Sequence, residues 1–565
     1  MSFFRKAIAL NNACFDTDDF TIEEPKPRNE DYVESFICKV DDIHESEKKV
    51  FTMKVDDIEH EILLVKQCGR ISAMGSKCPH YGAPLVNAVL GDCRIRCPWH
   101  GACFNMLTGD IEDYPSSNAL AIHEVRYDDD RNVYVRAHKE ELQTHKRRQE
   151  VIVKPMPRGW DTKGHFIIMG GGAAGTTAAV TLREYGFKGR ISVFCAENLA
   201  PYDRVKLSKD LNFDANKNKF YDMDFYKKMN IHIYPKVEVV VIFPDPKAVY
   251  VSSNNCVYYD KILIATGAVS RWNTVPGARS ASVRVLRNNE DLLVIRSLLA
   301  KNKKLVILGD GFIGLEFAAT VVNEVESVTI LTRSGYPLNS VFGSNIGSVI
   351  KEMFETKSIK FITCNTIKEF TITYENVLTH VVLDDDTVLP ASMCILCIGS
   401  THRTGYLIKT NVRLHESGAI EVDKFCRTNC EDIYAAGDVA CAPLAYYGVS
   451  AVVGHVGYAQ SMGRTAALSM LGYMQPLKAV PFFWTCLFGK TIRYAGHGPY
   501  DDVIYHGNVA EFRFVACYTK GNKVVAMASC GYDPIVSNFA EYVTANKILL
   551  KEEALDENFI ANFNA

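Results

Sequence analysis

Two copies of one glycine pattern constrain the fold of this chain more than any other feature. Each copy follows an apolar run with the length of a buried strand and opens an Ala-rich run with the length of a helix. The copies are Gly170, Gly172 and Gly175 after His165–Met169, and Gly309, Gly311 and Gly314 after Lys304–Leu308. In a strand–turn–helix unit, such glycines permit a tight turn and let a pyrophosphate approach the helix N-terminus. The sequence therefore predicts two dinucleotide-binding units.

The residue that follows the second strand of each unit bears on which nucleotide binds. In the first unit Glu197 stands about 20 residues after the glycines, where an acid bonds a ribose hydroxyl. In the second unit the strand 328–331 is followed by Thr332 and Arg333, with no acid. An arginine there accommodates a 2′-phosphate, so the sequence predicts a preference for NADPH, with a solvated loop residue as the alternative role of Arg333.

A cysteine–histidine pattern stands in the first third of the chain, among short β-like segments typical of an all-β domain. It reads Cys78-x-His80 and then Cys97-x-x-His100, each with a glycine close behind. Two Cys and two His suit a [2Fe–2S] cluster in which His replaces Cys on one iron. Zinc is the alternative, although its finger spacing usually pairs Cys with Cys and His with His.

The pattern resembles a Rieske cluster, which implies Cys78 and Cys97 on one iron and His80 and His100 on the other. Rieske proteins of the respiratory and photosynthetic complexes carry an additional Cys in each loop, whereas this chain has Ala83 and Trp99 at those places. It is similar to the soluble Rieske ferredoxin type.

Two further segments resemble signatures of flavoproteins that bind two dinucleotides. One strand ends in Ala265-Thr266-Gly267 and another in Gly437-Asp438. The resemblance implies FAD in the first unit and NAD(P)H in the second, with Asp438 on the FAD ribityl chain and Thr266 in the turn that closes the FAD domain.

Residues 201–209 contain no cysteine, so the redox disulfide of the disulfide reductases is missing. The segment resembles the ferredoxin-reductase and apoptosis-inducing-factor branch. That resemblance implies that Arg204 meets the FAD pyrophosphate and that Lys209 lies near the reactive edge of the flavin. The family has proline where this chain has Val205 or Lys206, which predicts a looser loop.

The same resemblance implies roles for three residues further along the chain. Phe312 would gate the flavin face, Glu316 would pair with Lys209 near the nicotinamide, and Trp484 would contact the cofactor. Phe312 and Trp484 also have a purely structural interpretation, as core aromatics. Where the family often has His-Trp, the chain has His455-Val456, so no flavin role is expected at position 456.

The 565 residues exceed the length of one domain several-fold, and the motifs divide them. The expected fold is multidomain: an all-β Rieske domain, two nested Rossmann-like α/β nucleotide-binding domains and an α+β C-terminal domain. The expected boundaries are 35–140 for the Rieske domain, 141–162 for a linker, 163–300 with 420–478 for the FAD domain, 301–419 for the NAD(P)H domain and 479–565 for the C-terminal domain.

Charge and hydropathy limit the partners and the location. Lys and Arg number 63 against 66 Asp and Glu, which indicates no nucleic-acid partner. No apolar run is long enough to span a membrane, and no secretory signal is recognisable, so an intracellular protein is expected, cytoplasmic or, given Arg5 and Lys6, mitochondrial. In that reducing setting, Cys394 and Cys397 are interpreted as part of a buried strand rather than as a redox pair.

Nearly the whole chain resembles apoptosis-inducing-factor-like proteins that carry a Rieske domain. The resemblance implies an FAD-dependent NAD(P)H oxidoreductase that passes electrons from NAD(P)H via FAD to a [2Fe–2S] cluster and an acceptor, which the sequence leaves unidentified along with the oligomeric state. One alternative is a redox-sensing, apoptosis-related interaction protein with little turnover, and cell death enters through the family name alone. Another is electron supply to a partner oxygenase.

Overall fold

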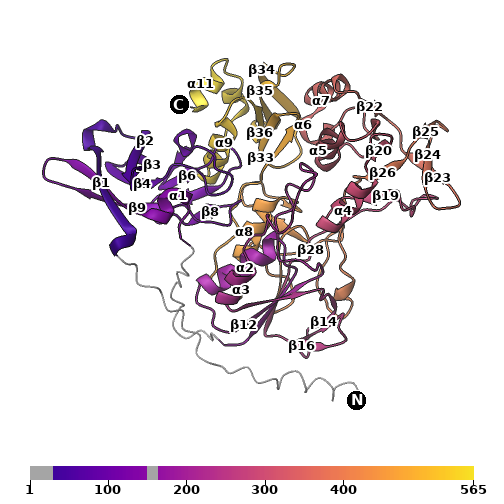
Figure 1. The fold of residues 1–565 in the computed structure, drawn as a ribbon, viewed down its shortest axis with the longest axis horizontal. Coiled ribbons are helices and arrows are strands. Elements are labelled where there is room, and N and C mark those ends of the chain that lie inside the picture. Colours follow the sequence, from indigo (N-terminus) through magenta and orange to yellow (C-terminus); the bar gives the residue numbers. More distant parts are fainter. Residues whose placement is uncertain (1–28, 149–162, 565) are drawn as a thin grey trace.

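The computed structural model describes residues 29–148 and 163–564. An antiparallel β domain comes first, two domains with parallel sheets and helices follow, and an antiparallel sheet with helices ends the chain. Figure 1 shows the N-terminal domain, in indigo and purple, beside the yellow C-terminal domain. The predicted fold class is confirmed. Arg5, Lys6 and residues 149–162 of the expected linker lie outside the described residues.

The N-terminal domain contains two antiparallel sheets joined by one core. The larger sheet has the order β1 (Tyr32–Lys39), β10 (Asn132–His138), β9 (Ile122–Tyr127), β4 (Arg70–Gly75), β3 (Ile58–Gln67) and β2 (Lys48–Val55). The smaller sheet has the order β5 (Val89–Gly91), β6 (Arg94–Arg96), β7 (Cys103–Asn105) and β8 (Ile111–Asp113). Leu63, Met74 and Phe104 are fully buried in the shared core. Helix α1 (Lys139–Thr144) follows β10 and includes the first residues of the expected linker.

The first α/β domain is built on a parallel sheet. Its strands are β13 (Ile231–Pro235), β12 (Arg190–Cys195), β11 (His165–Met169), β17 (Lys261–Ile264) and β29 (Ile433–Ala435). Its helices are α2 (Ala173–Glu184), α3 (Met223–Lys228) and α8 (Val456–Met470), and a small antiparallel sheet contains β14 (Val239–Phe243), β15 (Ala248–Val251) and β16 (Cys256–Tyr258). Helices α2 and α8 approach closely because residue 463 is glycine, where a Cβ would lie 2.1 Å from the carbonyl oxygen of Ala174.

The second α/β domain is inserted before β29, so the two domains are nested. Its parallel strands are β19 (Val283–Val285), β26 (Met393–Leu396), β20 (Lys304–Leu308), β21 (Ser327–Leu331) and β22 (Ile359–Ile362). Its helices are α4 (Asn289–Leu298), α5 (Phe312–Val321), α6 (Asn339–Phe342) and α7 (Ser344–Thr356), and its antiparallel strands are β23 (Ile367–Ile372), β24 (Leu378–Leu383) and β25 (Val388–Pro390). The pair β18 (Val269–Ser270) and β27 (Ser400–Thr401) joins the segments that enter and leave the insertion.

Cys394 and Cys397 lie at the buried end of this second sheet. Cys394 is within β26 and fully buried, and Cys397 follows the strand. Burial raises the pKa of the Cys397 thiol to about 12 and raises that of Cys394 as well. Both therefore remain protonated thiols at neutral pH, which suits a structural role.

The C-terminal domain packs helices on an antiparallel sheet. The strands are β32 (Phe482–Leu487), β33 (Lys490–Gly496), β36 (Lys523–Cys530), β35 (Arg513–Lys520) and β34 (Asp502–Asn508), and the helices are α9 (Ile535–Thr544), α10 (Lys551–Ala554) and α11 (Phe559–Asn564). Ile535 and Phe539 of α9 are buried against Val515 and Met527 of the sheet. In Figure 1 the other side of α9 faces β6 of the N-terminal domain.

Candidate functional site

The first glycine turn joins β11 to α2. A Cβ on Gly170 would lie 2.3 Å from the carbonyl oxygen of Ala265, and a Cβ on Gly175 would lie 1.9 Å from the carbonyl oxygen of Gly170. A Cβ on Gly172, the N-cap of α2, would meet no protein atom within 4 Å. The outer glycines are thus required by packing, while the middle one leaves room for a ligand at the helix N-terminus.

The second glycine turn, between β20 and α5, repeats this arrangement. A Cβ on Gly309 would lie 2.3 Å from the carbonyl oxygen of Cys397, and one on Gly314 would lie 2.4 Å from that of Gly309. Gly311, the N-cap of α5, again has nothing within 4 Å. Both turns therefore have the shape that admits a dinucleotide pyrophosphate.

A cavity of about 1000 Å³ begins at the first turn and runs between the domains. Its lining includes Glu197, Arg204, Thr266 and Asp438 of the first α/β domain, as well as Trp484 of β32. The volume and the elongated set of polar groups fit a ligand as large as FAD. The chain thus brings the expected FAD residues to one cavity.

Hydrogen bonds and an ion pair to neighbouring side chains hold the polar residues that line the cavity. Glu197 accepts hydrogen bonds from the Tyr202 hydroxyl at 2.6 Å and from Arg204. Asp438 pairs with Arg287 at 3.1 Å. The Thr266 and Tyr406 hydroxyls lie 2.9 Å apart. Glu197, Arg204, Thr266 and Asp438, the residues expected from the sequence to bind FAD, are thus held in position at the cavity wall.

Lys209 and Glu316 meet where the two α/β domains join the C-terminal domain. The Lys209 Nζ lies 2.7 Å from Glu316 Oε2, and Glu316 is buried. Ser208 donates to Oε2 at 2.5 Å, and Thr485 of β32 donates to Oε1 at 2.8 Å. The carboxylate thus has a complete set of donors and holds the lysine at the cavity, which both residues line.

Phe312 is half-buried at the start of α5 and also lines the cavity. Its ring packs edge-on against Phe483 and Phe342, with centroids 5.1 and 5.8 Å away. Phe312 therefore belongs to an aromatic cluster, as expected of a core residue, and it also faces the cavity, as expected of a residue near the flavin.

The four cluster residues converge at the tips of two loops with the same backbone pattern. In the first loop the Cys78 N–H donates to the Ala83 carbonyl and the Gly82 N–H to Cys78; in the second, Cys97 donates to Ala102 and Gly101 to Cys97. The buried thiols of Cys78 and Cys97 are neighbours that interact electrostatically. The Nδ1 atoms of His80 and His100 lie 3.1 Å apart.

These residues fit a two-iron cluster better than zinc. Two imidazole nitrogens bound at about 2.1 Å to one tetrahedral metal would lie roughly 3.4 Å apart, close to the observed separation. Among residues 29–148 and 163–564, no three His, Cys, Asp or Glu side chains converge as ligands of a single ion. The pairs, Cys with Cys and His with His, instead match the division of ligands over the two irons of a Rieske cluster.

Trp484 connects the cluster loops to the cavity. Its ring centroid lies 4.0 Å from that of His100 and 6.0 Å from that of His80. It also lines the cavity together with His455, whose ring packs edge-on against it at 5.0 Å. The cluster site and the cavity therefore share one indole ring as a wall.

Sequence reasoning missed two residues of this region. His455 lines the cavity and packs edge-on against Trp484; it stands in the family's His-Trp pattern, but the sequence alone assigns no role to it. Asp310 stands inside the second glycine pattern, and its carboxylate accepts a hydrogen bond at 2.5 Å from the hydroxyl of Ser334, which follows the second strand. Arg333 is exposed. A carboxylate, that of Asp310, therefore lies next to the end of this strand although positions 332 and 333 carry none.

Among the described residues, no helix has both the length and the apolar character needed to cross a membrane.

Two known families match this chain. Residues 164–463 match the pyridine nucleotide-disulphide oxidoreductases, and residues 34–125 match the Rieske [2Fe-2S] domain. Apoptosis-inducing factor 3 of Homo sapiens is 37% identical over 534 residues, which cover 94% of this chain and 87% of that protein. The benzene 1,2-dioxygenase system ferredoxin–NAD(+) reductase subunit of Pseudomonas putida is 29% identical, covering 60% of this chain and 83% of that one.

Solved structures give the same result for the reductase portion. The ferredoxin reductase for the CYP199A2 system from Rhodopseudomonas palustris superposes with a TM-score of 0.67 and 27% identity, covering 71% of this chain and 100% of that one. A chain of the covalent putidaredoxin reductase–putidaredoxin complex also gives a TM-score of 0.67, with 25% identity, covering 71% of this chain and 99% of that one.

Proposed function

Because the chain belongs to the pyridine nucleotide-disulphide oxidoreductases, among the apoptosis-inducing-factor-like proteins with a Rieske domain, we propose that it passes electrons from NAD(P)H through FAD to its own cluster and then to an acceptor. The family makes it an FAD-dependent NAD(P)H oxidoreductase with a [2Fe–2S] cluster. A bound flavin accepts two electrons as a hydride and can release them singly, and a cluster carries one. The proposed location is intracellular, cytoplasmic or mitochondrial, where thiols remain reduced.

The contact between Trp484 and His100 supports this proposal most strongly. The indole of Trp484 forms part of the cavity wall, and its ring centroid lies 4.0 Å from that of a residue we assign as a cluster ligand. Electron transfer between two centres depends on a short, packed path. This contact gives the chain such a path without an external carrier.

The remaining residues orient the reactants close to Trp484, since its chain neighbour Thr485 donates to Glu316. Glu316 accepts from Ser208, Lys209 and Thr485, so it fixes the ammonium group at the junction of three domains. We assign Lys209 to the flavin edge and Phe312 to the opening toward the second glycine turn. Residues Cys78, His80, Cys97 and His100 would hold the cluster.

For the acceptor, the matched relatives suggest a protein that takes one electron. One solved relative is a reductase joined to putidaredoxin, and another relative is a ferredoxin reductase subunit of a dioxygenase system. We propose a one-electron carrier protein, with electron supply to an oxygenase as one form of this role. The link to cell death comes from the name of a relative alone.

The test separates the flavin step from the cluster step. In a Cys78→Ala, Cys97→Ala variant, NAD(P)H should still bleach the flavin anaerobically, while reduction of cytochrome c should fall about 100-fold or more because the relay is lost. A matched control, Cys394→Ala, removes a buried thiol far from the relay in sequence. Unchanged cytochrome c reduction in the double variant would contradict the proposed order of transfer.

The alternative of an interaction protein makes the opposite prediction for the unaltered chain. It expects slow, stable flavin reduction and negligible steady-state turnover with any one-electron acceptor. Stopped-flow absorbance combined with electron paramagnetic resonance, before and after NADH or NADPH, distinguishes the two functions.

A further inference from the structure

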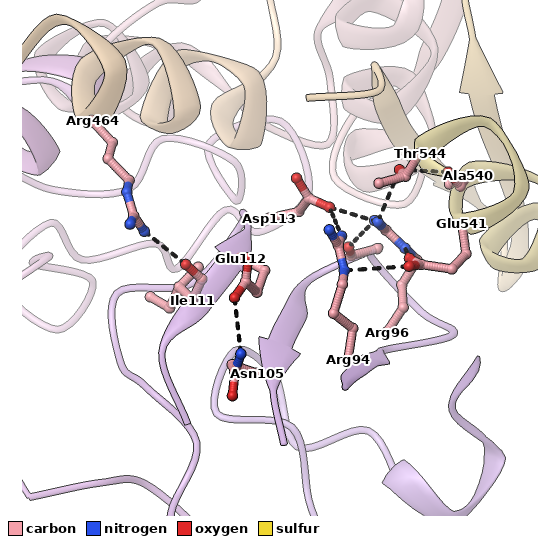
Figure 2. Close-up of polar contacts among 11 residues, drawn as sticks. Arg94, Arg96, Asn105, Ile111, Glu112, Asp113, Arg464, Ala540, Glu541 and Thr544 are labelled. Carbon is pink, nitrogen blue, oxygen red and sulfur yellow. Dashed lines mark hydrogen bonds and ion pairs between the residues drawn. The ribbon is translucent and has the colours of Figure 1, made fainter. Parts of the chain in front are cut away.

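Four charged side chains form a compact network between the Rieske domain and α9 of the C-terminal domain. Arg96 lies 2.7 Å from Glu541 and 2.5 Å from Asp113, and Arg94 lies 2.6 Å from Asp113 and 3.3 Å from Glu541. Figure 2 shows the two guanidinium groups between the two carboxylates, with Thr544 at the edge. Two cations and two anions thus neutralise each other across a domain boundary.

The network is removed from solvent. The side chain of Arg96 is 3% exposed, that of Glu541 13% and that of Asp113 16%. Burial by itself would raise the pKa of Asp113, but the neighbouring Arg96 and Arg94 outweigh it and keep that pKa below its usual range. Charge-assisted hydrogen bonds between planar groups are directional, so this network favours one relative position of the two surfaces that it joins.

The same contacts continue into the second cluster loop. Arg96 immediately precedes the cluster residue Cys97, and its NH1 donates to the Gly101 carbonyl at 3.0 Å. Ser537 of α9 donates to the Cys97 carbonyl at 3.1 Å, and Arg493 of β33 donates to the Trp99 carbonyl at 2.9 Å. The loop is therefore held by groups from another domain as well as by its own.

Helix α8 holds the Rieske domain from a second side. Arg464 donates to the Ile111 carbonyl at 2.8 Å, as Figure 2 shows, and Gln460 donates to the Ser116 carbonyl at 3.2 Å. Because the Rieske domain is held by α9 on one side and by α8 on another, it cannot rotate freely about either set of contacts.

We propose that Arg94, Arg96, Asp113 and Glu541 make the Rieske domain a stationary relay, which stays docked with His100 against Trp484 while it receives and delivers electrons. This inference rests on the proposed function. In the delivery step one electron leaves the reduced cluster and reduces one ferric haem of cytochrome c, with no proton transferred. Tyr81 and Trp99, each 37% exposed beside the ligand histidines, leave an edge of the docked domain open to such an acceptor.

A disulfide across the network tests whether the domain must move. A Cβ at position 91 would lie 3.2 Å from the Glu541 Cγ, the position that a cysteine Sγ would occupy. A disulfide needs roughly 3 Å between a Cβ and the opposite sulfur, so Gly91→Cys with Glu541→Cys should form one. The reduced variant lacks the Glu541 carboxylate, and the oxidised variant has a covalent link in its place. Mass spectrometry of peptides from the apoprotein measures the yield of the crosslink.

The stationary relay predicts near-complete crosslinking in the apoprotein, and cytochrome c reduction by the oxidised holoprotein within twofold of the unaltered chain. In the reduced variant, flavin-to-cluster transfer measured by stopped flow should slow at least tenfold. If crosslinking abolishes cytochrome c reduction while the cluster is still reduced by the flavin, the domain must move and the inference is wrong. Unslowed transfer in the reduced variant would also overturn it.

A second variant gives a readout that does not depend on turnover. Arg96→Met should increase amide hydrogen exchange in β5–β8 and α9 together, whereas Glu34→Gln, which removes a carboxylate from an exposed pair with Arg126, should not. Unchanged exchange in Arg96→Met would contradict a positioning role. Absence of any flavin-to-cluster transfer in the unaltered chain would instead refute the proposed function, so the two failures are distinguishable.

Discussion

The two glycine turns have nearly the same backbone but open on different surroundings. Gly170 and Gly309 have φ angles of 108° and 114°, and each pattern leaves its middle glycine free of neighbours. The first turn opens on the cavity of about 1000 Å³, whereas Gly311 of the second turn is exposed. The turn itself therefore provides a generic pyrophosphate site. Enclosure by the other domains distinguishes a resident cofactor from a nucleotide that must bind and leave.

The largest expected effect comes from the third glycine of each turn. Gly175→Ala would place a Cβ 1.9 Å from a backbone oxygen, so we expect loss of the resident flavin and a fall in kcat/KM of about 1000-fold. Gly314→Ala, at 2.4 Å, should keep the flavin spectrum and raise KM for NAD(P)H instead. Gly405→Ala, which meets no atom within 4 Å, is the control. Equal flavin loss in both variants would contradict the assignment of the first turn to the flavin and the second to NAD(P)H.

The middle glycines test ligand approach without strain in the protein. Gly172→Ala and Gly311→Ala add a methyl group to open space, so the free energy of unfolding of the apoprotein should change by less than about 1 kcal/mol. Flavin affinity should fall for the first variant and NAD(P)H affinity for the second, each by about 100-fold, because the methyl meets only the pyrophosphate. Thermal unfolding and equilibrium titration measure the two quantities. A loss of apoprotein stability would show that the positions serve packing instead.

Local and long-range features differed in how far the sequence could predict them. The glycine turns and the cluster loops are continuous segments whose spacing reflects their geometry, so Gly175 and Cys97 could be identified directly. The contact of Trp484 with His100 and the pairing of Arg96 with Glu541 join residues far apart in the chain. Such contacts depend on how complete domains pack against each other, and no periodic pattern in the sequence predicts that packing.

The Lys209–Glu316 pair links the two turns, since one residue comes from each α/β domain. Glu316→Gln removes the negative charge that pairs with Lys209 and replaces one of the two accepting oxygens with a donor, so the lysine should lose its position. We expect hydride transfer from NAD(P)H to slow about 30-fold with the flavin still bound. Stopped-flow bleaching gives the rate. Thr485→Val removes only the donor to Glu316 Oε1, so it should slow hydride transfer less than Glu316→Gln does. If Thr485→Val slowed the transfer more, a positioning role for Glu316 would be contradicted.

The smallest expected effect concerns nicotinamide choice, where the second turn differs most from the first. Arg333 is exposed and free to meet a 2′-phosphate, while Asp310, held by Ser334, presents a carboxylate that would repel it. Arg333→Glu should therefore lower kcat/KM for NADPH about 10-fold, and Asp310→Ala should raise it by a similar factor, each with little change for NADH. Steady-state ferricyanide reduction with both nucleotides gives the ratios. If Arg333→Glu leaves the ratio unchanged and Asp310→Ala shifts it, the acid within the glycine pattern sets the preference and the arginine is a solvated loop residue. If neither substitution shifts the ratio, the 2′-position is recognised by other residues.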